Sequence, residues 1–248
     1  MKKLITAFFM SWGMFCAVPC PYPHWDEDMR PMMVALLPFI GLLCGAVWLL
    51  ADHLIRLIGL SGLFAALLRA CVPWLMTGFI HLDGYMDCCD AIMSRRGLEE
   101  RQRILKDPHT GAFAVICLVL LCLCNVSLFS AWDGRRALAL LFIPAAVRCC
   151  SSMAVINFKP ISHSSYGKNF ADGVRPVHTL IPAFTLVASW LLCLFIGGSF
   201  AAPAASAAAF AAILHCRRQL GGMSGDISGF AITVGETAGL LILTLTGI

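Results

Sequence analysis

One segment of the chain concentrates carboxylates at helical spacing: His81-Leu-Asp-Gly-Tyr-Met-Asp-Cys-Cys-Asp90. Its aspartates, Asp83, Asp87 and Asp90, stand at positions i, i+4 and i+7, within about 60° of one another on a helix. Three carboxylates on one face repel each other unless a cation lies between them. Mg²⁺ prefers oxygen ligands and often binds substrate phosphates as well. The spacing therefore predicts a magnesium site, against the alternative of a solvated acidic face.

Two further segments could handle phosphate groups. In Ile104-Leu-Lys-Asp-Pro-His-Thr-Gly-Ala-Phe113, Lys106 can neutralise phosphate charge and Asp107 can join a metal or accept a proton. In Leu220-Gly-Gly-Met-Ser-Gly-Asp-Ile-Ser-Gly229, glycines surround a single aspartate, Asp226. Glycines let a backbone approach a ligand closely, and exposed N–H groups can cradle phosphate. A flexible turn between helices is the alternative for this last segment.

Two neighbouring stretches supply further polar side chains. Leu98, Ile104 and Leu105 predict a short amphipathic helix whose basic residues, among them Arg101, either bind substrate or anchor the chain at the membrane surface. The loop 162–172, which contains Tyr166, is polar enough to hold a second substrate.

Composition places these segments in a membrane protein. Of the 248 residues, 59% are hydrophobic and only 13% are charged, whereas a soluble domain carries about 25% charged residues. A net charge of +4 without a basic tract argues against a nucleic-acid partner. The thirteen cysteines lie mostly in apolar runs without CxxC spacing, which predicts free thiols rather than zinc ligands or disulfides.

Apolar runs long enough to cross a bilayer predict an all-α, polytopic membrane protein, with residues 1–248 forming one domain. The segment 4–18 is also apolar but is followed by prolines, so we expect a short interfacial or re-entrant helix, with a cleaved signal peptide as the alternative. Small residues in the first and last of the expected spans allow close helix packing, which would also suit a homodimer. The seven expected spans cover residues 32–51, 57–80, 111–130, 137–156, 179–200, 201–216 and 230–248.

The distribution of basic residues predicts the orientation. The loops 21–31, 81–110, 157–178 and 215–229 hold most of the lysines and arginines, whereas the opposite loops hold Arg56, Arg135 and Arg136. The positive-inside rule places the richer loops, and with them the acidic segment, on the cytoplasmic face of the cell membrane. Arg69, Arg148 and Glu236 fall within expected spans, where a charge needs a partner or marks a functional pocket.

The three chemistry-bearing segments, in this order, resemble the cobalamin synthase family, the adenosylcobinamide-GDP ribazoletransferases of cobamide biosynthesis. The likeness runs from about residue 8 to the C-terminus. The chain departs from the family pattern at Cys88-Cys89, which replace smaller or hydroxylated residues, and at Pro108-His109, which replace a Ser-Arg pair. Residues 125–175 match only loosely.

The resemblance implies a transfer reaction in the last stage of cobamide synthesis. The ribose 3′-hydroxyl of α-ribazole, or of its 5′-phosphate, attacks the cobinamide-linked phosphorus of adenosylcobinamide-GDP and expels GMP. Mg²⁺ would be held by Asp83, Asp87, Asp90 and Asp226, and the catalytic residues would be Asp87, Asp90 (the expected base), Lys106 and Asp107. The residues expected to bind substrate are His81, Gly84, Arg101, Gly111, Tyr166, Gly222, Gly225 and Asp226.

Two other classes of protein share part of this pattern. Membrane prenyltransferases and phosphatidyl-alcohol transferases also use aspartate-rich helices and Mg²⁺, but the former pair two such motifs and the latter space their acids more widely. A corrinoid or cation carrier could line a path with Arg69, Arg148 and Glu236, but the internal repeat that is common in carriers is absent from the sequence.

Overall fold

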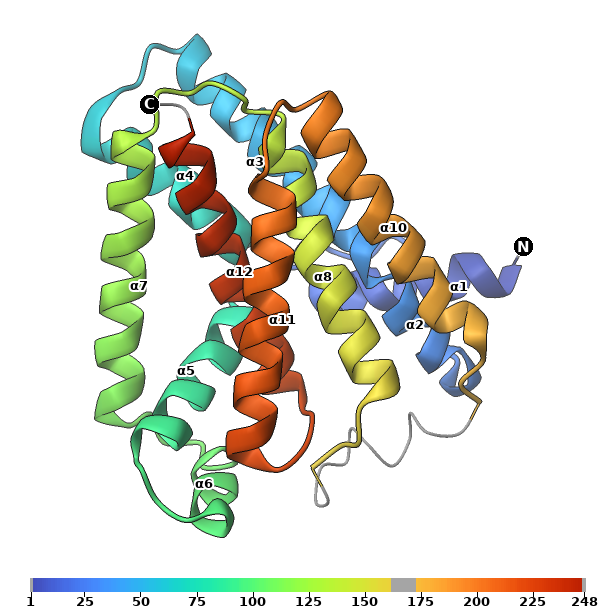
Figure 1. The fold of residues 1–248 in the computed structure, drawn as a ribbon. Helices are drawn as coiled ribbons and strands as arrows, with labels where there is room; N and C mark the ends of the chain where they lie inside the picture. The colour runs from blue at the N-terminus through green and yellow to red at the C-terminus, as the bar shows by residue number, and fades with distance from the viewer. Residues whose placement is uncertain (1, 162–172, 247–248) are drawn as a thin grey trace.

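The computed structural model describes residues 2–161 and 173–246, and within these ranges the secondary structure is helical apart from one parallel bridge, Pro160 to Met223 (Figure 1). The all-α prediction is therefore confirmed. The elements are α1 (Lys2–Phe15), the 3₁₀ helix η1 (Glu27–Met29), α2 (Arg30–Ala35), α3 (Leu37–Leu57), α4 (Gly62–Met76), α5 (Ile80–Met93), α6 (Leu98–Ile104), α7 (Ala112–Ala131), α8 (Ala139–Asn157), α10 (Pro176–Phe195), α11 (Ala201–Leu220) and α12 (Gly225–Leu245).

Within the described ranges, five helices are long and apolar enough to cross a membrane, or six if a bent pair counts as one span, so the expected count of about seven is not confirmed. The five are α3, α7, α8, α10 and α12. The expected span over 57–80 contains only the 15-residue helix α4, which is long enough to count as a span only together with α5, and the two meet at an angle of 93°. Gly78 and Phe79 take left-handed backbone conformations (φ 58° and 65°) at the break, a conformation that ends a right-handed helix.

The Ala-rich segment expected as the sixth span does form a helix, α11, but it is not among the five. Alanine adds little hydropathy, and Arg217 and Arg218 occupy the last turn. The N-terminal segment forms α1, which Figure 1 shows at the edge of the bundle beyond α10. Met10 of α1 is buried against Met33 and Val34.

Helix α8 lies at the centre of the bundle and is the most deeply buried of the five candidate spans. On one side it packs closely against α3. A Cβ on Gly41 would lie 2.6 Å from the Pro144 carbonyl oxygen, and a Cβ on Gly45 would overlap the Leu141 carbonyl oxygen. On the other side Gly235 and Gly239 of α12 press against Val147 and Ile143. The small residues of the first and last expected spans thus serve packing within the chain.

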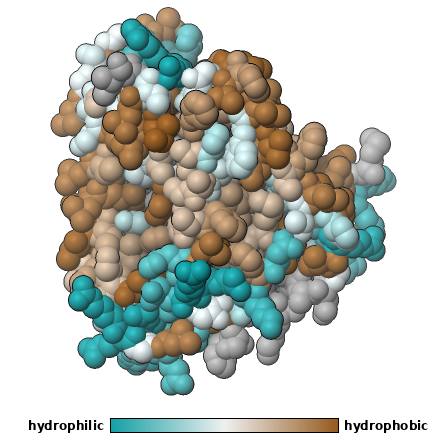
Figure 2. Space-filling model, in the orientation of Figure 1, coloured by the Kyte–Doolittle hydropathy of each residue, from teal (hydrophilic) through white to brown (hydrophobic). Residues whose placement is uncertain are grey.

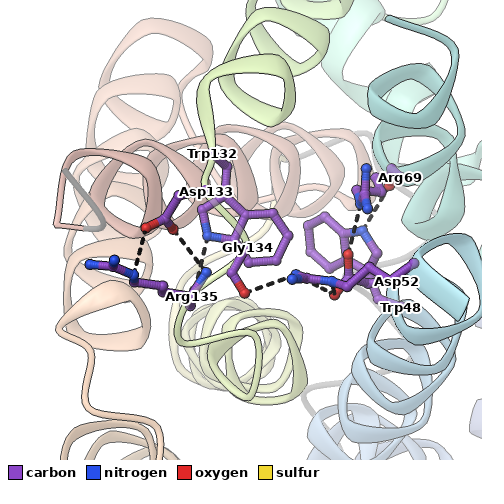
Figure 3. A network of polar contacts seen from close by, with 8 residues as sticks. Trp48, Asp52, Arg69, Trp132, Asp133, Gly134 and Arg135 are labelled. Carbon is purple, nitrogen blue, oxygen red and sulfur yellow. Dashed lines mark hydrogen bonds and ion pairs between the residues drawn. The ribbon is translucent and has the colours of Figure 1, made fainter. Parts of the chain in front are cut away.

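Asp52, only 2% exposed, lies in the last turns of α3 and joins three elements (Figure 3). Figure 1 shows this end of α3 at the end of the bundle opposite α6. The Asp52 carboxylate accepts hydrogen bonds from Arg69 Nε at 2.7 Å and Arg56 Nε at 2.8 Å, and Arg56 Nη2 donates to the Gly134 carbonyl at 2.9 Å. Gly134 (φ 83°) has no room for a side chain, since a Cβ there would overlap the Arg56 guanidinium. Arg69 is therefore half of a structural ion pair rather than part of a pathway.

The two ends of the molecule differ in surface character. Figure 2 shows hydrophilic residues gathered over the end that carries α6, with hydrophobic surface over the sides of the bundle. Exposed apolar side chains follow the outer faces of α7 and α10, such as Leu120 and Phe184. The last described residue, Thr246, lies at the Asp52 end, where its carbonyl accepts a hydrogen bond from Arg136 Nη1 at 2.5 Å. These surfaces are those of a multi-pass membrane protein.

Candidate active site

Two glycines allow α5 and α12 to cross in direct backbone contact. A Cβ on Gly84 of α5 would lie 2.8 Å from the Cα atom and the carbonyl oxygen of Asp226. A Cβ on Gly229 of α12 would lie 2.8 Å from the His81 carbonyl oxygen. Farther along, Phe230 stacks on the ring of Tyr85 with centroids 5.3 Å apart. The crossing therefore places the start of α12 directly against the first turns of α5.

This crossing gathers four carboxylates from opposite halves of the chain. Asp83, Asp87 and Asp90 all lie in α5, as their spacing predicted, and Asp226 lies in the first turn of α12. Asp83, Asp90 and Asp226 are all close enough to act electrostatically on Asp87. Asp83 is exposed, whereas the other three are partly buried, so the group opens to the surface.

The donor set suits a hard divalent cation, because every member is a carboxylate and each raises the local negative charge. Among the described residues, no three His, Cys, Asp or Glu side chains converge as a ready-made ion cage. Mg²⁺ does not require such a cage, since it usually keeps several waters and is bound by one or two carboxylates together with substrate phosphates. The residues present therefore fit Mg²⁺ as a shared ligand of protein and substrate.

Gly111 makes room for one of these carboxylates. It is the N-cap residue of α7, and a Cβ at this position would overlap both carboxylate oxygens of Asp90. The N-terminus of a helix carries partial positive charge, which favours a nearby carboxylate. Because Gly111 has no side chain, the Asp90 carboxylate can lie against the N-terminus of α7.

The glycine-rich segment before α12 divides into two parts with different surroundings. Gly222 is held against the chain that follows α8, since a Cβ there would lie 2.6 Å from the backbone nitrogen of Ile161. Gly225 is exposed, and a Cβ added to it would meet no atom of the described residues within 4 Å. Gly222 and Gly225 are the two glycines of this segment that were expected to bind substrate, and of these only Gly225 borders open space.

Ser224, which the sequence analysis did not single out, shapes this end of α12. As the N-cap it accepts a hydrogen bond from the Ile227 backbone nitrogen at 3.3 Å, and its hydroxyl donates to Asp226 Oδ2 at 3.3 Å. Serine is among the preferred N-cap residues, so its position just before an apolar helix was the signal that could have identified it.

The residues of the second motif lie at the exposed end of the molecule, after α6. Lys106 and Asp107 are both exposed. Asp107 accepts a hydrogen bond from the His109 backbone nitrogen at 3.0 Å, and its carboxylate lies 2.6 Å from His109 Nδ1. These contacts with His109 lower the pKa of Asp107. The histidine that departs from the family pattern thus favours the ionised form of this carboxylate.

The remaining expected substrate-binding residues have other surroundings. Arg101 turns toward the end of α11, where Nη1 bonds to the Gln219 side chain, and Gln102 Nε2 donates to the Leu220 carbonyl at 2.8 Å. His81 is buried beside Phe15, with ring centroids 6.2 Å apart. Tyr166 lies outside the described residues.

The charges expected inside spans are paired. Arg148 of α8 bonds to Glu236 of α12 at 2.7 Å, and both side chains are buried. With Arg69 bound to Asp52, neither arginine lines a path of the kind that a carrier would need. All thirteen cysteines are free thiols, as predicted.

Comparisons with known proteins agree on one family. The sequence model of a family described as cobalamin-5-phosphate synthase matches residues 7–244. A protein of Clostridium botulinum (strain Alaska E43 / Type E3) named adenosylcobinamide-GDP ribazoletransferase is 35% identical, over 97% of this chain and 97% of its own. A protein of the same name from Clostridium perfringens (strain 13 / Type A) is 34% identical, over 98% of this chain and 99% of its own. Another from Pseudomonas putida (strain KT2440) is 33% identical, over 84% of this chain and 85% of its own. No solved structure matches the chain.

Proposed function

The chain belongs to the cobalamin-5-phosphate synthase family, and we propose that it performs the family reaction at the crossing of α5 and α12 with the help of Mg²⁺. It is a transferase of the final stage of cobamide assembly, an adenosylcobinamide-GDP ribazoletransferase. The ribose 3′-oxygen of α-ribazole, or of its 5′-phosphate, forms a bond to the cobinamide-linked phosphorus. The bond from that phosphorus to GMP breaks, and the hydroxyl proton passes to a carboxylate.

The observation that supports this assignment is that four carboxylates from two distant segments lie around one helix crossing, three of them close enough to act electrostatically on Asp87. Asp83 and Asp226 are far apart in the sequence, yet Gly84 brings the α5 backbone into contact with Asp226 itself. Such a concentration of negative charge is unfavourable on its own, but it suits a reaction whose other reactant is a diphosphate. The residues that would hold the cation are Asp83, Asp87, Asp90 and Asp226.

A divalent cation in this position would neutralise diphosphate charge and the charge that develops on the departing GMP. The chain's own residues have distinct tasks beside it. Asp90, held against Gly111, is the proposed base for the ribose hydroxyl, and Lys106 provides positive charge for a phosphate. Asp107, in contact with His109, serves in proton transfer or joins the cation.

The substrates reach this site from the cytoplasm in our proposal. Three of the carboxylates lie on α5, which Figure 1 shows next to α6 and its basic side chains, and Figure 2 shows that this end of the molecule is hydrophilic. Basic loops remain on the cytoplasmic side of bacterial membranes. Free nucleotides such as GMP are also cytoplasmic products, so this orientation lets both the substrates and the leaving group exchange directly.

The test is release of GMP by purified, detergent-solubilised protein supplied with adenosylcobinamide-GDP and α-ribazole. We expect GMP and a cobamide product with Mg²⁺ and neither with EDTA. Asp83→Asn should abolish turnover while the protein still inserts in the membrane. Asp133→Asn, which removes a carboxylate at the opposite end that pairs with Arg135, is the matched control and should retain full turnover.

Two results would count against the proposal. Undiminished GMP release by Asp83→Asn would remove this carboxylate from the metal site. Turnover that persists in EDTA after exhaustive dialysis would remove Mg²⁺ from the reaction, while leaving the transferase assignment in place.

A further inference from the structure

The ion pair between Arg148 and Glu236 is sealed inside the bundle, away from the carboxylate site. Arg148 Nη1 donates to Glu236 Oε1 at 2.7 Å and to the Pro144 carbonyl at 3.0 Å, and Arg148 is 0% exposed. Next to the pair, a Cβ on Gly235 would lie 2.6 Å from Val147 Cγ1. A buried pair of this kind adds little net stability, because desolvation of both charges offsets their attraction.

The hydrogen bonding of this cluster is incomplete. Arg148 Nε and Nη2 are buried without a hydrogen-bond partner among the described residues, and so is Nε2 of His81. Arg148 is also close enough to His81 to act on it electrostatically. A buried polar atom without a hydrogen-bond partner destabilises a fold, so an apolar cluster of the same volume would stabilise the bundle better. The charged residues therefore serve a purpose other than stability.

Their place in the fold indicates that purpose. Small and branched residues line the contacts of α12 with a four-residue repeat: Gly235 and Gly239 face Ala209 and Ala205 of α11, and Val147 and Ile143 of α8. The ion pair belongs to this same contact, because Arg148 follows Val147 on α8 and Glu236 follows Gly235 on α12. It adds a directional polar contact that holds α12 at one position along α8.

We propose that Arg148 and Glu236 are positioning residues that fix the register of α12 and so place Asp226 against α5. The inference rests on the proposed function, since it takes these carboxylates as the working site. Glu236 follows Asp226 by ten residues on one continuous helix, about 15 Å along its axis. A polar pair in an apolar helix contact is an established way to specify register at some cost in stability. Arg148 also interacts electrostatically with His81, which lies at the start of α5, the other helix of the crossing.

The test separates positioning from stability with three variants. Glu236→Gln breaks the pair, and the double variant Arg148→Met with Glu236→Leu replaces it by apolar side chains. Asp52→Asn weakens a different buried pair, far from the site, and is the control. Thermal unfolding in detergent, kcat and KM for GMP release, and Mn²⁺ binding by electron paramagnetic resonance are measured on each.

We expect Glu236→Gln to lower kcat about tenfold or more, since misplacement by an ångström costs up to about 100-fold, with KM changed less than about threefold. The double variant should recover thermal stability but neither kcat nor Mn²⁺ affinity. Asp52→Asn should lose stability while its folded fraction keeps both. Recovery of kcat together with stability in the double variant would overturn the inference, as would a Glu236→Gln protein altered in stability alone.

A measurement without substrate or metal keeps this inference separate from the proposed function. Hydrogen exchange of the backbone amides of residues 225–230 should accelerate in Glu236→Gln and in the double variant, but not in Asp52→Asn. If wild-type protein released no GMP yet these amides responded, the proposed function would fail and the register role would stand. Unchanged exchange in both variants would overturn the register role, whatever the activity.

Discussion

Substitution of Gly84 by alanine tests the α5–α12 crossing most directly. The added Cβ would lie 2.8 Å from two backbone atoms of Asp226 and 3.2 Å from its carbonyl carbon. Non-bonded carbon atoms prefer about 3.5–4.0 Å, and backbone atoms of a packed helix cannot rotate aside. The two helices must therefore separate by about 1 Å. Overpacking of this degree costs about 1–3 kcal/mol of folding stability.

The separation should affect turnover more than folding. Asp226 moves away from Asp83 and Asp87 by the same amount, and a misplacement of 1 Å costs up to about 100-fold in rate. We therefore expect Gly84→Ala to remain folded and to lower kcat for GMP release by about 10- to 100-fold. Gly97→Ala is the matched control, because a Cβ at Gly97 would meet no atom within 4 Å in the described part of the chain. Wild-type turnover by folded Gly84→Ala protein would refute the claim that this contact sets the site.

Three further predictions follow from contacts described above. Gly111→Ala should displace the Asp90 carboxylate and lower kcat by about tenfold or more, with little change in unfolding temperature; an unchanged kcat would exclude Asp90 as the base. Asp52→Asn should cost about 1–3 kcal/mol of stability, because the asparagine has no charge and only one oxygen to accept hydrogen bonds from Arg56 and Arg69; calorimetry in detergent would measure it, and a loss under about 0.5 kcal/mol would contradict the importance of this contact. Since His109 lowers the pKa of Asp107, His109→Ala should raise that pKa and move the acid limb of the pH–rate profile to higher pH; an unmoved limb would mean that ionised Asp107 is not required.

The long helices could be predicted well because each is a continuous apolar run with clear ends. Helix α7, expected over 111–130, spans Ala112–Ala131, and α8, expected over 137–156, spans Ala139–Asn157. In both cases glycine or charged residues precede the run, and polar or turn-forming residues follow it. Boundaries set by local composition are readable from the sequence.

The break between α4 and α5 could not be predicted in the same way. The run from 57 to 80 is largely apolar, so its hydropathy is that of one span. The 93° turn depends on left-handed conformations at Gly78 and Phe79. Gly78 follows the C-cap residue of α4 and is a common signal of a helix end, but a phenylalanine with positive φ is rare and its conformation at position 79 is not indicated by its residue type. Tertiary packing around the turn selects it, as the hydrogen bond from the Ala17 backbone nitrogen to the Met76 carbonyl illustrates.

In the candidate site, too, features set by local spacing could be predicted and features set by contacts between helices could not. The helical spacing of three aspartates predicted their shared element, and α5 contains all three. The contribution of Asp226 came from the family resemblance, because no local pattern relates positions 83 and 226. The tasks of Gly84, Gly229 and Gly111 are defined by backbone and side-chain contacts across helices, which a single sequence does not contain. The sequence likewise did not identify Arg148 and Glu236 as partners. It indicated only that each charge, because it lies in an apolar segment, needs a partner or marks a functional pocket.

The hydrogen bond between Arg136 and Thr246 has a practical consequence for measuring the orientation of the protein in the membrane of living cells. It anchors the last turn of the chain at the Asp52 end of the bundle, opposite the carboxylates. A reporter enzyme fused after the C-terminus would therefore emerge on the membrane side that the chemistry does not use. If the carboxylates face the cytoplasm, as we propose, alkaline phosphatase, which needs an oxidising compartment, would be active in such a fusion and a cytoplasmic fluorescent reporter would not.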